Sequence, residues 1–98
     1  MSEPIQVRIK GDSMWPTFSD GSIVKFTPLE ENDVLKVGDV VLSHHPLKKN
    51  ILLVKRVHLV ETDDRYFLVG DQTDPLASED SHNFGSVPRS SIIAYHLE

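Results

Sequence analysis

The run ILLVKRVHLVE, residues 51–61, is the longest mainly apolar stretch of this 98-residue chain. Its aliphatic and β-branched side chains are typical of a strand, because they fit a pleated, half-buried surface. The turn-forming residues TDDR, 62–65, follow at once, and YFLVGD, 66–71, continues as a second strand-like run. This order predicts two neighbouring strands of a β-meander and places the chain in the mostly β class.

The rest of the chain consists of shorter strand candidates separated by polar segments. Four apolar or alternating runs bounded by turn formers are residues 5–10, 22–28, 40–44 and 86–97. In the first run, Ile5, Val7 and Ile9 are expected to face inward. The polar residues 29–39 and 73–83 are expected to be loops. We therefore expect a single domain, residues 1–98, built as a small antiparallel folded sheet or barrel.

The composition argues against several classes of function. Fifteen acidic and ten basic residues give a net charge of −5, whereas nucleic-acid binding requires clustered positive charge. The chain has no cysteine, which excludes disulfides and thiolate nucleophiles. No apolar run approaches the roughly 18 residues of a membrane span, and the first residues lack the apolar core of a secretory signal. We expect a cytoplasmic protein with no membrane span, no nucleic-acid partner and no cofactor.

Lys55 stands in the middle of the most apolar strand candidate. In a regular strand its side chain shares one face with Ile51, Leu53, Val57 and Leu59. Burial among such residues disfavours the charged form, and a fall of about three units from an ordinary pKa of ~10.4 leaves a lysine largely neutral at pH 7. A neutral lysine can act as a general base. The alternative is a lysine whose charged end reaches solvent at a sheet edge.

Ser13 lies in GDSMWPTF, residues 11–18, between a strand candidate and the turn signature of residues 19–22. A serine beside glycine and aspartate is most simply a turn former. A serine becomes a nucleophile when a base lies close to it, and a desolvated lysine can be that base without a histidine. Ser13 and Lys55 together therefore form a candidate Ser-Lys pair.

Three segments resemble the conserved boxes of the type I signal peptidase family of Ser-Lys proteases. Residues 11–18 resemble its Ser-Met-x-Pro-Thr box, and LLVKRV, residues 52–57, resembles its Lys-Arg box. GDQTDPLASEDSHNFGSVP, residues 70–88, resembles the third box, which begins with Gly-Asp-Asn and continues with Ser-x-Asp-Ser-Arg. The three boxes occur in the family's order and span most of the chain.

The resemblance implies a role for each matching residue. Ser13 is implied to be the nucleophile and Lys55 the general base, with the Ser13 N–H as part of the oxyanion hole. Ser78 is implied to hydrogen-bond and orient the lysine. Asp80 is implied to belong to an ion pair beside the site, and Asp71, together with the preceding glycine, to form the turn that returns the third box to it.

The sequence departs from the family pattern at three positions of the boxes. Gly11 stands where some members place a second hydroxyl for the oxyanion, Gln72 stands for the usual asparagine, and His82 stands for the arginine that usually pairs with the aspartate. The chain is most similar to compact members without an anchor, which remove a short N-terminal propeptide from nickel-type superoxide dismutase. The implied partner is a precursor with an N-terminal extension, nickel superoxide dismutase being the expected example.

Two other interpretations remain open. LexA-like and UmuD-like proteins also use a Ser-Lys dyad, but they cut their own chain upstream of the serine, commonly at Ala-Gly or Cys-Gly, and no Ala or Cys precedes Ser13 here. A catalytically inactive β domain that grips an extended peptide by strand addition is a non-enzymatic alternative. The five histidines are scattered and the adjacent His44 and His45 are expected to point apart, so we expect no metal site.

Overall fold

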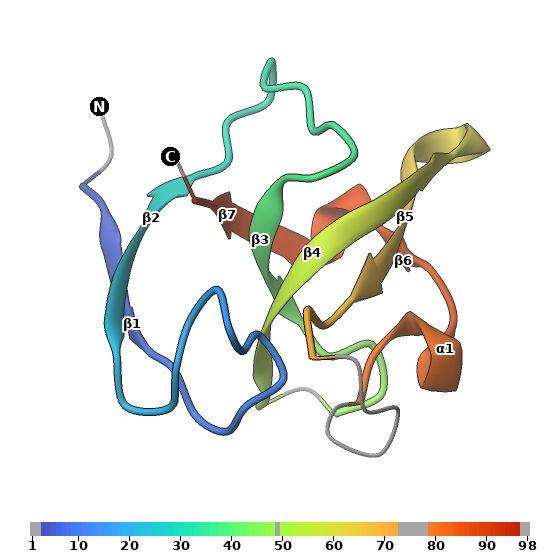
Figure 1. Cartoon of the computed structure of the whole chain (residues 1–98). Helices are drawn as coiled ribbons and strands as arrows, with labels where there is room; N and C mark the ends of the chain where they lie inside the picture. The colour runs from blue at the N-terminus through green and yellow to red at the C-terminus, as the bar shows by residue number, and fades with distance from the viewer. Residues whose placement is uncertain (1–2, 49, 73–78, 97–98) are drawn as a thin grey trace.

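The computed structural model describes residues 3–48, 50–72 and 79–96. Within these residues, seven strands form one sheet whose neighbours are all antiparallel. The strands are β1 (Ile5–Arg8), β2 (Ile23–Pro28), β3 (Val40–His44), β4 (Leu52–Glu61), β5 (Arg65–Val69), β6 (Val87–Pro88) and β7 (Ile92–Tyr95). Their order across the sheet is β1-β2-β7-β3-β4-β5-β6 (Figure 1). The expected mostly β, antiparallel fold is confirmed.

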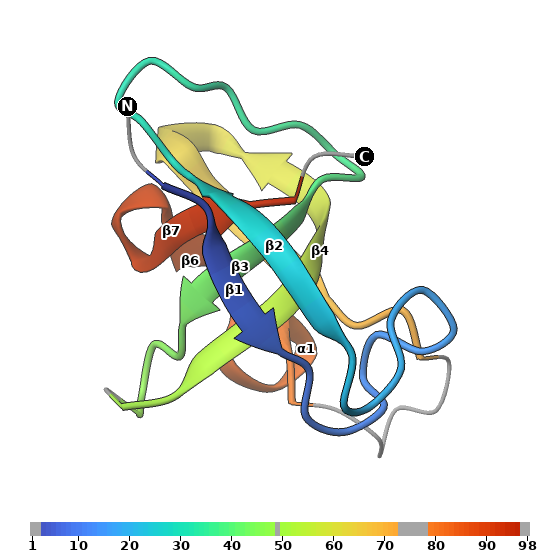
Figure 2. The same cartoon turned by 90° about the vertical axis from the view of Figure 1, so that its left-hand side faces the viewer.

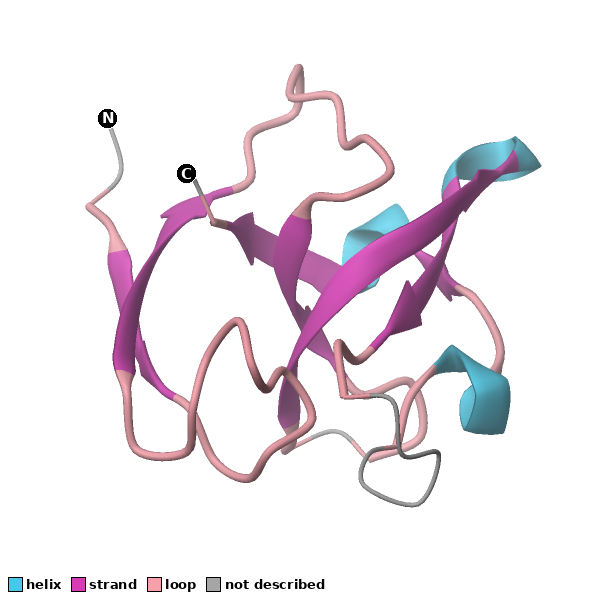
Figure 3. Cartoon of the chain, in the orientation of Figure 1, coloured by secondary structure: helices cyan, strands magenta, loops and turns pink. Residues whose placement is uncertain are grey.

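Helical structure is confined to three short turns in the described residues, as Figure 3 shows: η1 (Thr62–Asp64), α1 (Ser81–Phe84) and η2 (Arg89–Ser91). The expectation of a continuous loop over residues 73–83 is wrong at its end, where α1 begins. The Asp80 side chain accepts the N–H of His82, and the Asn83 side chain accepts the N–H of Asp80. These two reciprocal bonds form a capping box, which satisfies backbone groups at the helix start.

The sheet folds so that the β1–β2 ribbon crosses β3 and β4 (Figure 2). Only the last residues of β2, Thr27 and Pro28, pair with β7, so most of the ribbon is free to turn over the other strands. The fold encloses an apolar cluster of seven buried residues: Ile9, Met14, Val24, Phe26, Val40, Leu42 and Ala94. Burial of each large apolar side chain contributes about 1.5–3 kcal/mol, so this cluster fixes the ribbon in place.

A second buried cluster lies on the other side of β3. Its members are Leu35, Val41, Val57, Tyr66, Leu68, Val87 and Ile92. Successive side chains of a strand point to opposite faces, and β3 sends Val40 and Leu42 into the first cluster and Val41 into the second. This two-sided burial explains why β3 begins with three consecutive apolar residues.

β4 departs from the regular strand that the sequence predicts. Lys55 and Val57 are buried on one face, but Leu59 is 51% exposed. The register with β5 passes from Val57–Leu68 to Leu59–Phe67, which leaves His58 as an extra residue. A bulge of this kind bends a strand and changes which side chains face inward. The expected common face of residues 51–59 is therefore wrong at both ends, because Ile51 lies outside β4 and is 43% exposed and Leu59 is 51% exposed, and it holds where Lys55 lies.

Candidate active site

Ser13 lies in a compact loop that the core holds in place. Met14 is 1% exposed and belongs to the first apolar cluster, whereas Trp15 is 52% exposed. Backbone bonds from Trp15 N–H to the Asp12 carbonyl, 3.0 Å, and from Phe18 N–H to the Met14 carbonyl, 2.9 Å, close successive turns. The two apolar residues beside the serine thus have different positions, because Met14 anchors the loop and Trp15 faces solvent.

Gly11 sets the direction in which the chain enters this loop. Its φ of 80° lies in the left-handed region that side chains other than glycine rarely adopt. The Gly11 N–H donates to the Asp20 carboxylate over 2.7 Å. That amide is therefore engaged in the structure and is not free to donate to an oxyanion.

The amide of Ser13 itself has a different environment. Its carbonyl accepts the Gln72 N–H over 2.9 Å, which fixes the peptide group that follows the serine. No described residue accepts a hydrogen bond from the Ser13 N–H. An amide without a partner beside a half-buried serine is the type of donor that stabilises an oxyanion.

Lys55 is buried in the middle of β4, with 2% of its surface exposed. Burial lowers the pKa of Lys55 from its ordinary value of 10.5, and the nearby carboxylates of Asp80 and Glu79 raise it by less. Within the described ranges its Nζ forms no ion pair and no hydrogen bond. The interpretation of Lys55 as a side chain that reaches solvent is therefore wrong, and its amine suits a base better than a structural cation.

Ser13 and Lys55 line the same groove, which has a volume of about 480 Å³. Residues 5–10 form one wall, residues 52–55 form the other, and Leu42 and Ile93 belong to the same lining. We call this the β1–β4 groove. Ser13 Oγ and Lys55 Nζ form no hydrogen bond among the described contacts, and such catalytic contacts are often long before a substrate binds.

Both walls of the β1–β4 groove are strand edges without a neighbour in the part of the chain that the structure describes. β1 pairs only with β2, and β4 begins to pair with β5 at Arg56, so residues 52–55 pair only with β3. The Ile9 N–H donates to the Ser22 carbonyl. Because antiparallel ladders alternate, the N–H and C=O groups of Gln6 and Arg8 point to the open edge. An extended peptide can pair with these groups.

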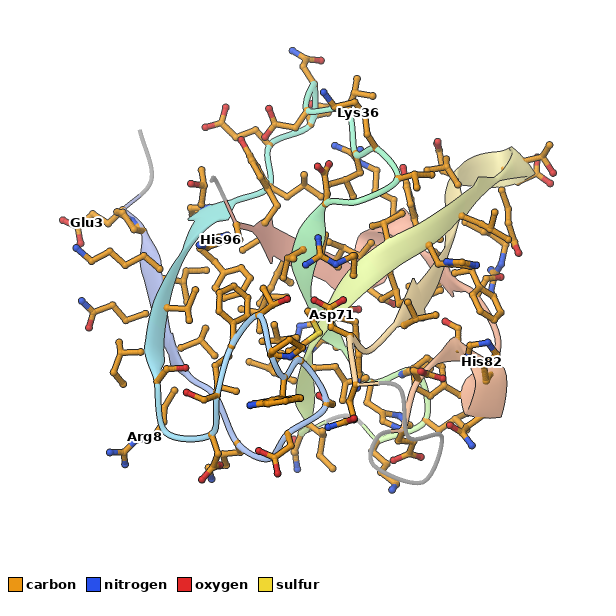
Figure 4. All side chains as sticks on the ribbon, viewed as in Figure 1. Glu3, Arg8, Lys36, Asp71, His82 and His96 are labelled. Carbon is orange, nitrogen blue, oxygen red and sulfur yellow. The ribbon has the colours of Figure 1, made fainter. Side chains whose placement is uncertain are left out.

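Three residues from the three boxes meet through their side chains. Arg56 donates from Nε and Nη2 to Asp71, over 2.8 and 2.7 Å, and the Thr17 hydroxyl also donates to Asp71. Burial alone raises the pKa of Asp71, but the hydrogen bonds from Arg56 and Thr17 and the charge of Arg56 outweigh it, so the pKa is lowered. The carboxylate is therefore ionised and ties the Ser13 loop to the strand of Lys55. Figure 4 shows Asp71 in the centre of the molecule.

Asp80 lies close enough to Lys55 to influence its pKa. Its Oδ1 lies 3.0 Å from Nδ1 of His82, whose side chain is mostly exposed and lies at the outer edge in Figure 4. The expected Asp80–His82 contact is therefore formed. Ser78, the residue implied to orient Lys55, lies outside the described residues.

Two contributors to the site were not assigned a role from the sequence. Thr17 was part of the first box and Arg56 part of the second, and neither was given a role. The alternation of side chains in β4 could have indicated a separate role for Arg56, because it turns the Arg56 side chain away from Lys55. The signal for Thr17 was weaker, because its partner Asp71 is 54 residues away in the sequence.

Other parts of the described chain offer fewer candidate binding or catalytic groups. A second pocket, of about 320 Å³, lies between residues 33–40 and the end of β7, but its Asp33 and Asp39 already accept amides of their own loop. No group of three metal-binding side chains occurs in residues 3–48, 50–72 and 79–96. None of the helices described there has the length and apolar composition needed to cross a bilayer.

No protein-family model matches the chain, and no curated protein matches its sequence.

Proposed function

We propose that this protein is a serine endopeptidase of the signal peptidase type, with Ser13 as the nucleophile and Lys55 as the general base. One observation carries the proposal: a buried lysine without a described ion pair lines the same groove as a serine whose N–H has no partner among the described residues. A desolvated lysine amine can deprotonate a serine hydroxyl. The resemblance of the three sequence boxes assigns the same roles to the same two residues.

The proposed reaction proceeds through an acyl-enzyme. Neutral Lys55 takes the Ser13 hydroxyl proton while Oγ attacks the scissile carbonyl carbon, and the Ser13 N–H donates to the oxyanion. The C–N bond then breaks, and Lys55 gives its proton to the leaving amine. Lys55 next deprotonates a water molecule that attacks the acyl carbon. The acid product leaves and Ser13 regains its hydroxyl.

The substrate that suits the β1–β4 groove is an extended peptide. The open edges of β1 and of residues 52–55 allow such a peptide to bind as an added strand, with backbone hydrogen bonds supplying affinity. A short, flexible N-terminal extension of a precursor protein has this form. The resemblance to propeptide-removing members of the family makes nickel superoxide dismutase the precursor we propose to be cut.

The open strand edges also favour a second candidate function, a peptide-binding domain without catalytic activity. Strand addition needs only the backbone groups of β1 and β4, so it does not depend on Ser13 or Lys55. This candidate gives no role to the buried amine of Lys55, although such burial is costly.

Processing of the precursor separates the candidates. The dismutase precursor is incubated with wild type, with Ser13→Ala and with no enzyme, and the product masses are measured. The proposal predicts one cut in the N-terminal extension by wild type alone. Binding of the precursor without cleavage, by wild type and Ser13→Ala equally, supports the peptide-binding domain, and cleavage by Ser13→Ala contradicts the assignment of the nucleophile.

A further inference from the structure

The charge of the β1–β4 groove differs in sign from that of the whole protein. Arg8 and Lys10 belong to its lining, as does Lys55, whereas the chain carries a net charge of −5. No acidic side chain belongs to the described lining. The charged side chains that a ligand meets in this groove are therefore all basic, and such a local field attracts an anionic partner.

Arg8 and Lys10 are exposed side chains that a ligand can reach. Among the described residues, neither side chain has an ion-pair or hydrogen-bond partner. The acids that lie near them in the sequence do not line the groove: Asp20 accepts a backbone N–H of its own loop, and Asp12 is absent from the lining. Figure 4 shows Arg8 at the periphery of the molecule, with Glu3 beyond the other end of β1.

The two faces of β1 and of its continuation differ in chemistry. Ile5, Val7 and Ile9 pack in or against the first apolar cluster, and alternation places Arg8 and Lys10 on the opposite face. A peptide added to the open edge of β1 continues this pattern, because directly opposite residues of neighbouring strands have side chains on the same face. Alternate residues of the peptide thus face the apolar cluster, and the residues between them pass beside the two cations.

We propose that the β1–β4 groove selects extended peptides with acidic side chains at alternate positions, which pair with Arg8 and Lys10. The proposal rests on the proposed function and deepens it by naming the class of substrate. Carboxylates two residues apart in an extended strand lie on one face, as the side chains of Arg8 and Lys10 do. Opposite charges across neighbouring strands stabilise the pairing, and the positive charge of the groove also speeds the encounter with an acidic peptide.

The apolar part of the lining does not provide this selectivity. Met14, Leu42 and Ile93 belong to the lining and can bury apolar side chains of many sequences. Replacement of aspartate by asparagine in the peptide removes charge and changes the shape little, so the resulting change in affinity isolates the contribution of the two cations. Each exposed ion pair is expected to contribute up to about fivefold in affinity.

The first test measures binding without cleavage, by calorimetry with Ser13→Ala. The probes are short peptides of alanine, valine and threonine that contain Asp-Ala-Asp, Asp-Asp-Ala or Asn-Ala-Asn. The Asp-Ala-Asp peptide should bind severalfold more tightly than the Asn-Ala-Asn peptide, and salt should reduce this advantage by screening. It should also bind more tightly than the Asp-Asp-Ala peptide, which has the same charge but places its carboxylates on opposite faces of an extended strand. Equal affinity of the Asp-Ala-Asp peptide and either comparison peptide overturns the inference.

Variants that remove one positive charge locate the selectivity. Added to Ser13→Ala, Arg8→Gln and Lys10→Gln should each reduce the advantage of Asp-Ala-Asp over Asn-Ala-Asn, and together they should remove it. Lys36→Gln is the matched control, because Lys36 is exposed, does not line the groove and lies well away from Arg8 in Figure 4. It should leave the advantage nearly unchanged. A full advantage after both groove replacements, or an equal loss in Lys36→Gln, overturns the inference.

Cleavage by wild type separates this inference from the proposed function. The dismutase precursor is prepared with Asp-Ala-Asp or Asn-Ala-Asn at successive positions of its N-terminal extension, and kcat/KM is measured for each. A higher kcat/KM for Asp-Ala-Asp is expected at positions near the cut. Cleavage with equal kcat/KM for the two triplets at every position overturns the inference and leaves the proposed function intact. Selective binding by Ser13→Ala, with no precursor cut by wild type, instead refutes the proposed function.

Discussion

Arg56 and Asp71 form a two-point ion pair, in which Nε and Nη2 of the guanidinium donate to the two oxygens of one carboxylate. Arg56 follows Lys55 in β4, and Asp71 precedes Gln72, whose N–H donates to the Ser13 carbonyl. The pair thus connects the strand of the proposed base to the loop of the proposed nucleophile. Two parallel hydrogen bonds fix the orientation of the guanidinium relative to the carboxylate as well as the distance between them. A single hydrogen bond does not fix this orientation.

Asp71→Asn should weaken this connection and lower the free energy of unfolding at neutral pH by about 1–3 kcal/mol, because it removes the charge of the carboxylate that pairs with the half-buried Arg56. The folded pKa of Asp71 lies below its ordinary value of 3.8. The stabilisation that ionised Asp71 contributes is therefore complete above the ordinary pKa and is lost as the pH falls through the folded pKa. Denaturant unfolding at several pH values should show that the difference between wild type and Asp71→Asn disappears in acid. A difference that persists unchanged in acid would mean that the ion pair is not its source.

Ser13→Ala and Lys55→Met should each abolish cleavage, and the double variant should lose little more than either single variant. Residues that act as one unit are strongly non-additive. The measurement is the rate of precursor processing for the three variants, with circular dichroism to establish that each is folded. Substantial activity in Lys55→Met would show that another group is the base.

Lys55→Met should also stabilise the protein at neutral pH, because it removes an amine that is costly to bury. The folded pKa of Lys55 is lowered from 10.5, so the unfolded chain binds more protons between the folded value and 10.5, and the stability of wild type rises with pH in that window. The advantage of Lys55→Met should therefore shrink as the pH approaches 10.5. Unfolding curves measured across this window test the sign, and an advantage that grows with pH would contradict it.

Met14→Ala should destabilise the protein by about 2–5 kcal/mol, because it opens a cavity in the first apolar cluster. It should also reduce activity, since Met14 anchors the loop that carries Ser13. Trp15→Ala is the matched control: its side chain is exposed, so its effect on stability should be small. Thermal unfolding of the two variants gives the comparison, and equal loss of stability in both would argue against the assigned anchor.

Periodicity predicted most of the strands because their apolar patterns are local. β3 matches the expected residues 40–44, and β4 and β5 follow one another through the expected turn. The bulge at His58 was missed because the residues on both of its sides are apolar and fit either register. The α1 helix was missed because it is a single turn whose start depends on reciprocal side-chain bonds of Asp80 and Asn83.

Less of the candidate site than of the fold could be predicted from the sequence. Alternation in β4 placed Lys55 among apolar side chains without deciding between burial and a charged end in solvent, and nothing local indicates that Ser13, 42 residues earlier, lines the same groove. Only the family resemblance linked them. The Thr17–Asp71–Arg56 contacts depend on how the sheet folds over itself, which no pattern of apolar residues specifies.

Formation of an acyl-enzyme at Ser13 is the most direct test of the proposed chemistry. The purified protein is treated with a serine-directed acylating probe at several pH values, and the intact mass and the labelled peptide are determined by mass spectrometry. One label on Ser13 is predicted for wild type, with a rate that rises with pH as Lys55 loses its proton, and no label is predicted for Ser13→Ala or Lys55→Met. Labelling of Ser13→Ala to the same extent, or no labelling of folded wild type at any pH, would contradict the assignment of Ser13 and Lys55 as a catalytic pair.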